Sequence, residues 1–256
     1  MENLENELSG ELEGQSRWDR AVRDYAVRGL LLCLTLFLIE VGVLFLVPSI
    51  PFFPGEKGYY ISQANQLSNT TSHASGPQLF YDIFTNNYRI SLIEMIPGLG
   101  VIFFAISMYV TARVSLAIAF NEPQPVPGAV LVILLFILPH SYLELPAYAV
   151  ATAEGLYLLY AIIKVLSNSR GGDEGRMTKE VWQLGINVLI VTVMLAVAAL
   201  FETTEIVLGA FNAFLTWIPF IGIAYLVYRL NKRLSEIRKE AQMQVQPSRA
   251  TEPTSG

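Results

Sequence analysis

Four glutamates and one histidine stand in strongly apolar segments of this chain. The carboxylates are Glu40, Glu94, Glu144 and Glu154, and His140 is the only imidazole among them. A charge in apolar surroundings is costly, so such residues are functional candidates that could carry protons or bind a cation. In the alternative reading, His140 and Glu144, four positions apart on one helical face, only satisfy backbone groups freed by nearby prolines.

Pro139 and Pro146 bracket a predicted helix break in the apolar block 128–166. A proline inside a helix removes a hydrogen-bond donor and clashes with the preceding turn. The block is too long for one crossing of a ~30 Å hydrocarbon core and short for two. We therefore predict a proline-broken helical hairpin with a buried tip, held in shape because His140 and Glu144 hydrogen-bond each other.

The chain contains no recognisable catalytic motif. A single histidine with scattered glutamates makes a poor zinc site, and neither HExxH nor a phosphate-binding glycine loop occurs. We therefore expect no enzymatic activity, no metal, no cofactor and no nucleic-acid partner. The sequon Asn69-Thr70-Thr71 predicts glycosylation at Asn69.

The composition is that of a membrane protein. Of the 256 residues, 53% are hydrophobic and 15% are charged, whereas average soluble domains contain about 25% charged residues. Apolar blocks long enough for a spanning helix of roughly 20 residues recur along the chain. The sequence therefore predicts an all-α integral membrane protein with about six transmembrane helices, including the hairpin.

The predicted organisation has three parts. Residues 1–28 form an acidic cytoplasmic N-terminus with an interfacial amphipathic helix, and 231–256 form a cytoplasmic basic helix and a disordered tail. Between them, 29–230 is a helical transmembrane domain with an extracytoplasmic loop at about 52–87. Within it, we expect one kinked helix at about 90–120 and an exposed acidic connection between the last two spans.

The distribution of Lys and Arg predicts the topology, because these residues accumulate on the cytoplasmic side. Six crossings leave only Lys57 and Arg89 outside, with Arg113 at the inner interface and both termini cytoplasmic. Five crossings would move the basic tail outside. In the six-crossing arrangement, Asn86 and Asn87 are predicted to cap the second span at the outer surface.

The stretch LPHSYLELPAYAVATAEGL resembles a motif of the stage II sporulation protein M family, PHG-x-x-E-L-x-A followed by Gly-Leu. The matching residues are Pro139, His140, Glu144, Ala147, Ala153, Gly155 and Leu156. Upstream, FTNNYRISLIEMIPGLG is similar to the family segment with paired asparagines, here Asn86 and Asn87, and Asn121 stands where an asparagine precedes a turn. Ser141 and Glu122 depart from the glycines common in the family.

The resemblance implies a non-enzymatic, multi-pass scaffold of the cell membrane. The family's namesake recruits cell-wall hydrolases during engulfment, so the expected partners are the lipid bilayer, other membrane or envelope proteins, and further copies of the chain. Most relatives have no assigned function. Two alternatives stay open: a permease or transporter component that uses the intramembrane carboxylates and the broken hairpin, and an intramembrane enzyme.

Overall fold

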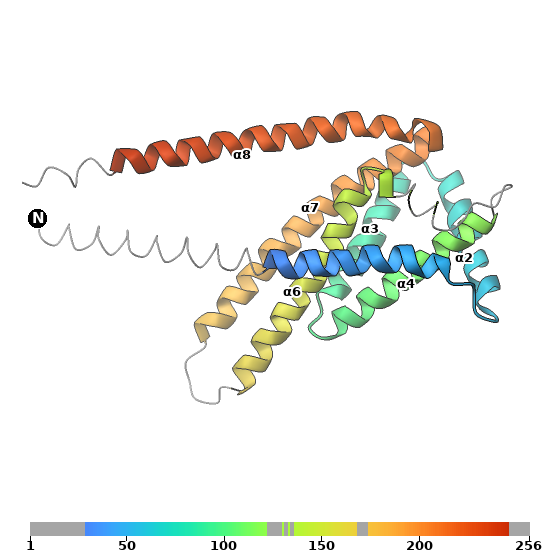
Figure 1. The fold of residues 1–256 in the computed structure, drawn as a ribbon, viewed down its shortest axis with the longest axis horizontal. Helices are drawn as coiled ribbons and strands as arrows, with labels where there is room; N and C mark the ends of the chain where they lie inside the picture. The colour runs from blue at the N-terminus through green and yellow to red at the C-terminus, as the bar shows by residue number, and fades with distance from the viewer. Residues whose placement is uncertain (1–28, 122–129, 131–132, 134–135, 168–173, 246–256) are drawn as a thin grey trace, which may run out of the picture.

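A computed structural model describes residues 29–121, 130, 133, 136–167 and 174–245 of the chain. All regular elements in this part are helical (Figure 1), which confirms the all-α prediction. In chain order they are the first span Gly29–Ser49, which ends in η1 (Val47–Ser49), α2 (Glu56–His73), α3 (Gly76–Glu94), α4 (Leu99–Asn121), α6 (Ser141–Ser167), α7 (Glu174–Asn212), η2 (Ala213–Thr216) and α8 (Trp217–Val245).

Five helical segments of the described residues are long and apolar enough to cross a membrane. They are Gly29–Ser49, Leu99–Phe120, Ser141–Ser167, Val181–Gly209 and Ala213–Ile237. Together with the composition, they identify an integral membrane protein. The predicted interfacial helix in 1–28, most of the first hairpin arm and the end of the tail lie outside the described residues.

The α3–α4 connection corrects the prediction of one kinked helix at 90–120. α3 ends at Glu94, and α4 begins at Leu99 after a tight turn in which Gly98 has a φ of 78°. Glycine adopts this left-handed conformation without a steric cost, and Pro97 stands directly before it. The two helices pack against each other and against α6 and α7. The stretch predicted as a loop at 52–87 is therefore largely helical, and α3 lies inside the bundle.

Contacts across the bundle show which helix ends lie together. Arg113 of α4 donates to the carbonyl oxygen of Ile50, just after the first span, at 2.7 Å. Leu44 of the first span packs with Ala112 of α4 and Leu145 near the start of α6. The first span and α4 therefore run toward the same end of the bundle, where α6 starts. The prediction that Arg113 lies at the end opposite the first span's exit was wrong.

This arrangement adds a helix to the bundle that the sequence analysis had assigned largely to a loop. Since α4 runs toward the end where the first span finishes, α3 must run in the opposite direction before it. α3, a polar helix, thus lies beside the apolar helices of the bundle. Hydropathy could not identify it, because its surroundings are the neighbouring helices α4, α6 and α7.

The break before α6 is narrower than predicted. The backbone N–H of Tyr142 bonds the carbonyl oxygen of Pro139 at 3.2 Å, and α6 starts at Ser141. Pro146 lies inside this helix, so its prediction as one side of the break was wrong. Buried alanines surround it, and close packing with neighbouring helices offsets the missing hydrogen bond. The predicted burial of the tip is confirmed at His140, which is 7% exposed.

The last two spans join later than predicted. α7 continues through Glu202 and Glu205 and changes direction only near Gly209, which has a φ of 76°. The acidic segment is thus helical, and Glu205 within it is buried. At the turn, an aromatic cluster joins α6, α7 and the start of α8; its rings are those of Tyr142, Phe201, Trp217 and Phe220. Beyond it, α8 extends away from the bundle (Figure 1), and residues 221–237 are exposed.

Candidate functional site

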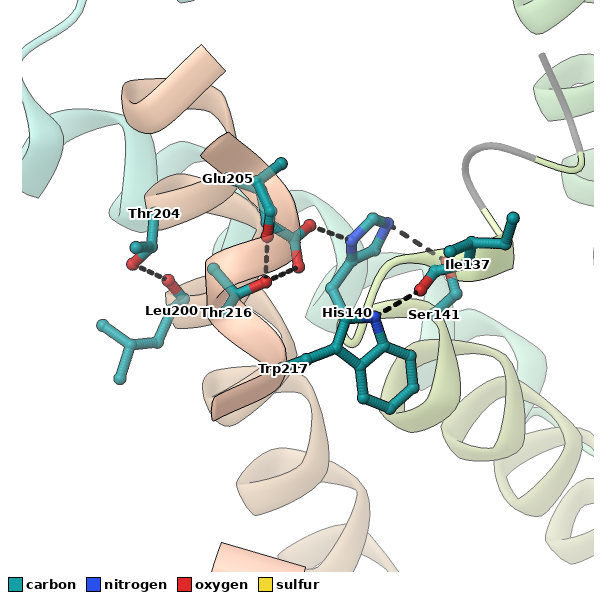
Figure 2. Close-up of polar contacts among 9 residues, drawn as sticks. Ile137, His140, Ser141, Leu200, Thr204, Glu205, Thr216 and Trp217 are labelled. Carbon is teal, nitrogen blue, oxygen red and sulfur yellow. Dashed lines mark hydrogen bonds and ion pairs between the residues drawn. The ribbon is translucent and has the colours of Figure 1, made fainter. Parts of the chain in front are cut away.

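A fully partnered polar group closes the end of the bundle where α6 starts (Figure 2). This His140 cluster consists of His140, Ser141, Glu205 and Thr216, all buried. His140 Nδ1 contacts Glu205 Oε2, and His140 Nε2 lies 3.2 Å from Ser141 Oγ. The hydroxyl of Thr216 lies 3.2 Å from the other oxygen of Glu205. Both ring nitrogens and both carboxylate oxygens therefore have partners.

The predicted hydrogen bond between His140 and Glu144 was wrong. His140 uses its ring nitrogens for Glu205 and Ser141, while Glu144 Oε1 accepts a hydrogen bond from the Tyr148 hydroxyl at 3.0 Å. Sequence reasoning missed Glu205, because it is 65 positions from His140 and was assigned to an exposed connection. A signal was present in the sequence: if the helix continues through FETTEI, Glu205 falls on the same face as the apolar residues Leu195 and Ala198.

The first residue of α8 contacts the backbone just before the break. The indole N–H of Trp217 donates to the carbonyl oxygen of Ile137 at 2.9 Å (Figure 2). The Tyr142 and Trp217 rings meet edge to face, with centroids 5.4 Å apart. The contact comes from Trp217, whereas the prediction named His140 and Glu144, whose printed hydrogen bonds go to other side chains.

Three glutamates from three helices form a second polar group, the central carboxylates: Glu40 of the first span, Glu94 of α3 and Glu144 of α6. Glu40 and Glu94 are both 0% exposed. The Ser107 hydroxyl donates to Glu94 Oε1 at 2.8 Å. Glu94 Oε2 and both carboxyl oxygens of Glu40 accept no hydrogen bond from the described residues. Glu40 is close enough to interact electrostatically with the other two.

Glu154, the fourth predicted carboxylate, has a partner on a neighbouring helix. It is 2% exposed and accepts a hydrogen bond from the side-chain amide of Asn187 on α7. This contact joins the middle of α6 to α7. Asn187 was not singled out by the sequence, because a lone asparagine in an apolar helix carries no motif.

The asparagines take positions different from those predicted. Asn86 and Asn87 lie within α3 and cap no helix, so that prediction was wrong. The Asn86 side-chain amide donates to Asn87 Oδ1 at 3.1 Å, and Asn87 is buried. Asn121 is the last residue of α4, and its side chain lies outside the described part. Asn69 is exposed on α2, and its glycosylation stays a prediction.

Gly155 explains how Glu94 reaches the centre of the bundle. A Cβ atom at this position of α6 would lie 2.7 Å from the Glu94 carbonyl oxygen. Real side chains do not approach backbone this closely, so only glycine lets the α3–α4 turn lie against α6. The glycine of the Gly-Leu pair therefore has a local structural reason here: it makes room for the helix end that carries Glu94.

A buried cation lies apart from the central carboxylates, at the junction of η1, α2 and α4. Arg113 is 0% exposed; its Nε lies 3.0 Å from the Tyr109 hydroxyl, and its Nη2 lies 3.6 Å from Glu56 Oε2. The guanidinium also lies over the Phe52 and Phe53 rings. The hydrogen bond from Tyr109 holds the pKa of Glu56 below its ordinary value. This group ties α2 to the bundle.

The central carboxylates suit protons better than a metal ion. Within the described residues, no three His, Cys, Asp or Glu side chains are grouped closely enough to hold a metal ion. The central carboxylates come from three separate helices, and those of Glu40 and Glu94 have oxygens without a hydrogen-bond partner among the described residues. A carboxyl group that lacks partners in such surroundings is stable when it carries a proton or faces a cation.

The family model described as Stage II sporulation protein M matches residues 31–204. No curated protein and no solved structure matches the chain. The matched range extends from the first span through most of α7. It includes His140 and all four predicted glutamates, and it ends one residue before Glu205. Since the match covers well over half of the chain, the protein belongs to the stage II sporulation protein M family.

Proposed function

We propose that this protein is a permease component that carries protons through the central carboxylates. The observation that supports this most strongly is Glu40, a fully buried glutamate whose two carboxyl oxygens accept no hydrogen bond from the described residues. A carboxylate kept for stability alone would have partners, as Glu205 and Glu154 do. Glu40 is instead available to take up and release a proton.

The helix breaks support the same proposal. Discontinuous helices recur at the transport sites of secondary transporters, where backbone and titratable side chains meet near the middle of the membrane. In this bundle, Glu94 is the last residue of α3 before the turn, and His140 directly precedes α6. Each break thus has a buried titratable side chain beside it. The proposal includes no enzymatic activity.

The proposed setting is the cell membrane, with both termini in the cytoplasm. In the observed order of helices, the end of the bundle that carries the His140 cluster then faces outward. The outer side holds Lys57 and Arg113, while the Lys and Arg residues of both termini and of the α6–α7 connection lie inside. The positive-inside rule favours this orientation.

Proton movement through reconstituted vesicles tests the proposal. The full chain is placed in vesicles that contain a pH-sensitive dye, and a potassium diffusion potential drives protons inward. We expect the wild type to acidify the lumen and Glu40→Gln to lose this flux with an unchanged melting temperature, because the amide preserves the side chain's shape. Glu236→Gln, at an exposed position of α8, is the matched control.

Two results would overturn the permease proposal. One is a wild-type flux no greater than that of protein-free vesicles, and the other is an undiminished flux in Glu40→Gln. Carbodiimide labelling gives a second measurement, because this reagent attacks protonated carboxyl groups in apolar surroundings. Mass spectrometry should find the label at Glu40 and should not find it at Glu236.

A membrane scaffold is the second candidate, and α8 favours it. Residues 221–237 of this helix are exposed, and they include large apolar side chains such as Ile223, Leu226 and Leu230. A scaffold could use this surface for another membrane protein. In that case Glu40→Gln would leave the cellular phenotype intact, whereas removal of α8 would abolish it and would release crosslinked partners in native membranes.

A further inference from the structure

A polar pocket lies beside the central carboxylates, between the first span, α3, α4 and α6. Its empty volume is about 390 Å³, a figure that includes space open to the surroundings. Its polar lining consists of Asn86, Asn87, Ser107, Thr111, Glu144 and Tyr148. We call it the α3–α4–α6 pocket.

The lining favours a cation. Glu144 contributes a carboxylate, whose Oε1 accepts a 3.0 Å hydrogen bond from the Tyr148 hydroxyl. None of the residues that line the pocket is a lysine, an arginine or a histidine. An anion would therefore find no cationic side chain in the described lining of the pocket.

The asparagine pair adds further hydrogen-bonding groups to the pocket. Asn87 is 7% exposed, and its amide has one hydrogen bond to a described residue, the 3.1 Å contact in which its oxygen accepts from Asn86. Asn86 is exposed, and its side chain also lines the pocket. A bound group with several N–H donors would use the Asn86 oxygen and Glu144 together.

The remaining walls restrict the ligand further. Leu44, Ile90, Met108 and Leu145 line the other sides of the pocket. A bare inorganic cation gains nothing from such walls and prefers oxygen ligands on all sides. A short hydrocarbon chain with an ammonium head matches both the acceptors and the apolar walls.

We propose that the α3–α4–α6 pocket binds a small primary ammonium solute, with its charged head at Glu144 and its hydrocarbon part against Leu44 and Leu145. This inference rests on the proposed function, because it places a solute site beside Glu40, the proposed proton carrier of the permease. Glu144 interacts electrostatically with Glu40. A cation bound at Glu144 would therefore lower the affinity of Glu40 for a proton.

Thermal stabilisation of the full chain in detergent measures the binding. The probe is ethylammonium chloride, and the comparisons are sodium chloride, neutral propanol and tetramethylammonium chloride, which has no N–H donor. We expect ethylammonium to raise the melting temperature in a concentration-dependent manner and the three comparisons to leave it unchanged at equal concentration. Equal stabilisation by sodium or by tetramethylammonium would overturn the proposal.

Two variants locate the site. Glu144→Gln should weaken the apparent affinity for ethylammonium by roughly tenfold to hundredfold, since it removes a charge-assisted hydrogen bond. Thr111→Val removes one hydroxyl from the pocket wall at nearly constant shape and should weaken binding severalfold. Its matched control is Thr204→Val, at an exposed position of α7 outside the pocket. Undiminished binding in both pocket variants would place the ligand elsewhere and refute the inference.

The failures of the two proposals are distinguishable. Proton flux that requires Glu40, without any stabilisation by ethylammonium, would leave the permease in place and remove the solute. Stabilisation that requires Glu144, without flux in vesicles, would leave a binding site and remove the permease. Proton flux that requires Glu40, together with stabilisation by ethylammonium that requires Glu144, would support both.

Discussion

The two polar groups of this bundle differ in how their atoms are partnered. In the His140 cluster, both ring nitrogens of His140 and both oxygens of Glu205 contact other side chains. Among the central carboxylates, Glu40 has no hydrogen-bond partner at either oxygen among the described residues. Glu40 and Glu94 are as buried as the His140 cluster, so burial alone does not distinguish the two groups. The comparison teaches that the partners of a buried charge, more than its depth, separate a structural role from a functional one.

The sharpest test of the comparison is to remove one member of the partnered pair. Glu205→Ala leaves the imidazole of His140 buried without its carboxylate, which typically costs about 3–5 kcal/mol. We expect the largest drop in melting temperature in detergent from this variant. Thr204→Ala, one residue away at an exposed position, is the control and should have little effect. If Glu40→Gln proved as destabilising as Glu205→Ala, the distinction between the two groups would disappear.

A smaller effect is expected where the backbone positions Glu94. In Gly155→Ala, the new methyl group would meet the Glu94 carbonyl oxygen at 2.7 Å, so the α3–α4 turn must move. Forcing an extra carbon into a packed interior typically costs about 1–3 kcal/mol. Gly185→Ala in α7, where nothing lies within 4 Å, is the matched control and should be neutral or slightly stabilising. Equal melting temperatures for both variants would contradict the close contact.

The smallest effect concerns Glu56, which holds α2 beside Arg113. Because its pKa in the folded protein lies below the ordinary 4.5, its stabilising contact is complete above that pH and is lost as the pH falls through the folded pKa. Glu56→Gln should therefore melt slightly below the wild type at neutral pH, and this difference should vanish in acid. A difference that grows on acidification would refute the contact, and Glu236→Gln should show none at either pH.

Composition was enough to predict the all-α membrane fold, and apolar surroundings were enough to select Glu40, Glu94 and Glu154, which are buried, and Glu144, which is partly exposed. The partners were not predictable in the same way. His140 and Glu205 are 65 positions apart, and their contact depends on how α6 and α7 pack. α3 was missed for a related reason: its polar composition is typical of a loop, and only its neighbours make it part of the bundle. Local spacing also misled the prediction for His140 and Glu144.

The attachment of α8 has a mechanical consequence. Its first residues are fixed beside the His140 cluster through Trp217, while residues 221–237 are exposed and Gly209 lies in the preceding turn. With 29 residues, α8 is about 43 Å long at 1.5 Å per residue. A tilt of about 10° at its base would displace the far end by roughly 7 Å over that length. A small change of angle near Thr216 would therefore correspond to a large displacement at the far end of the helix.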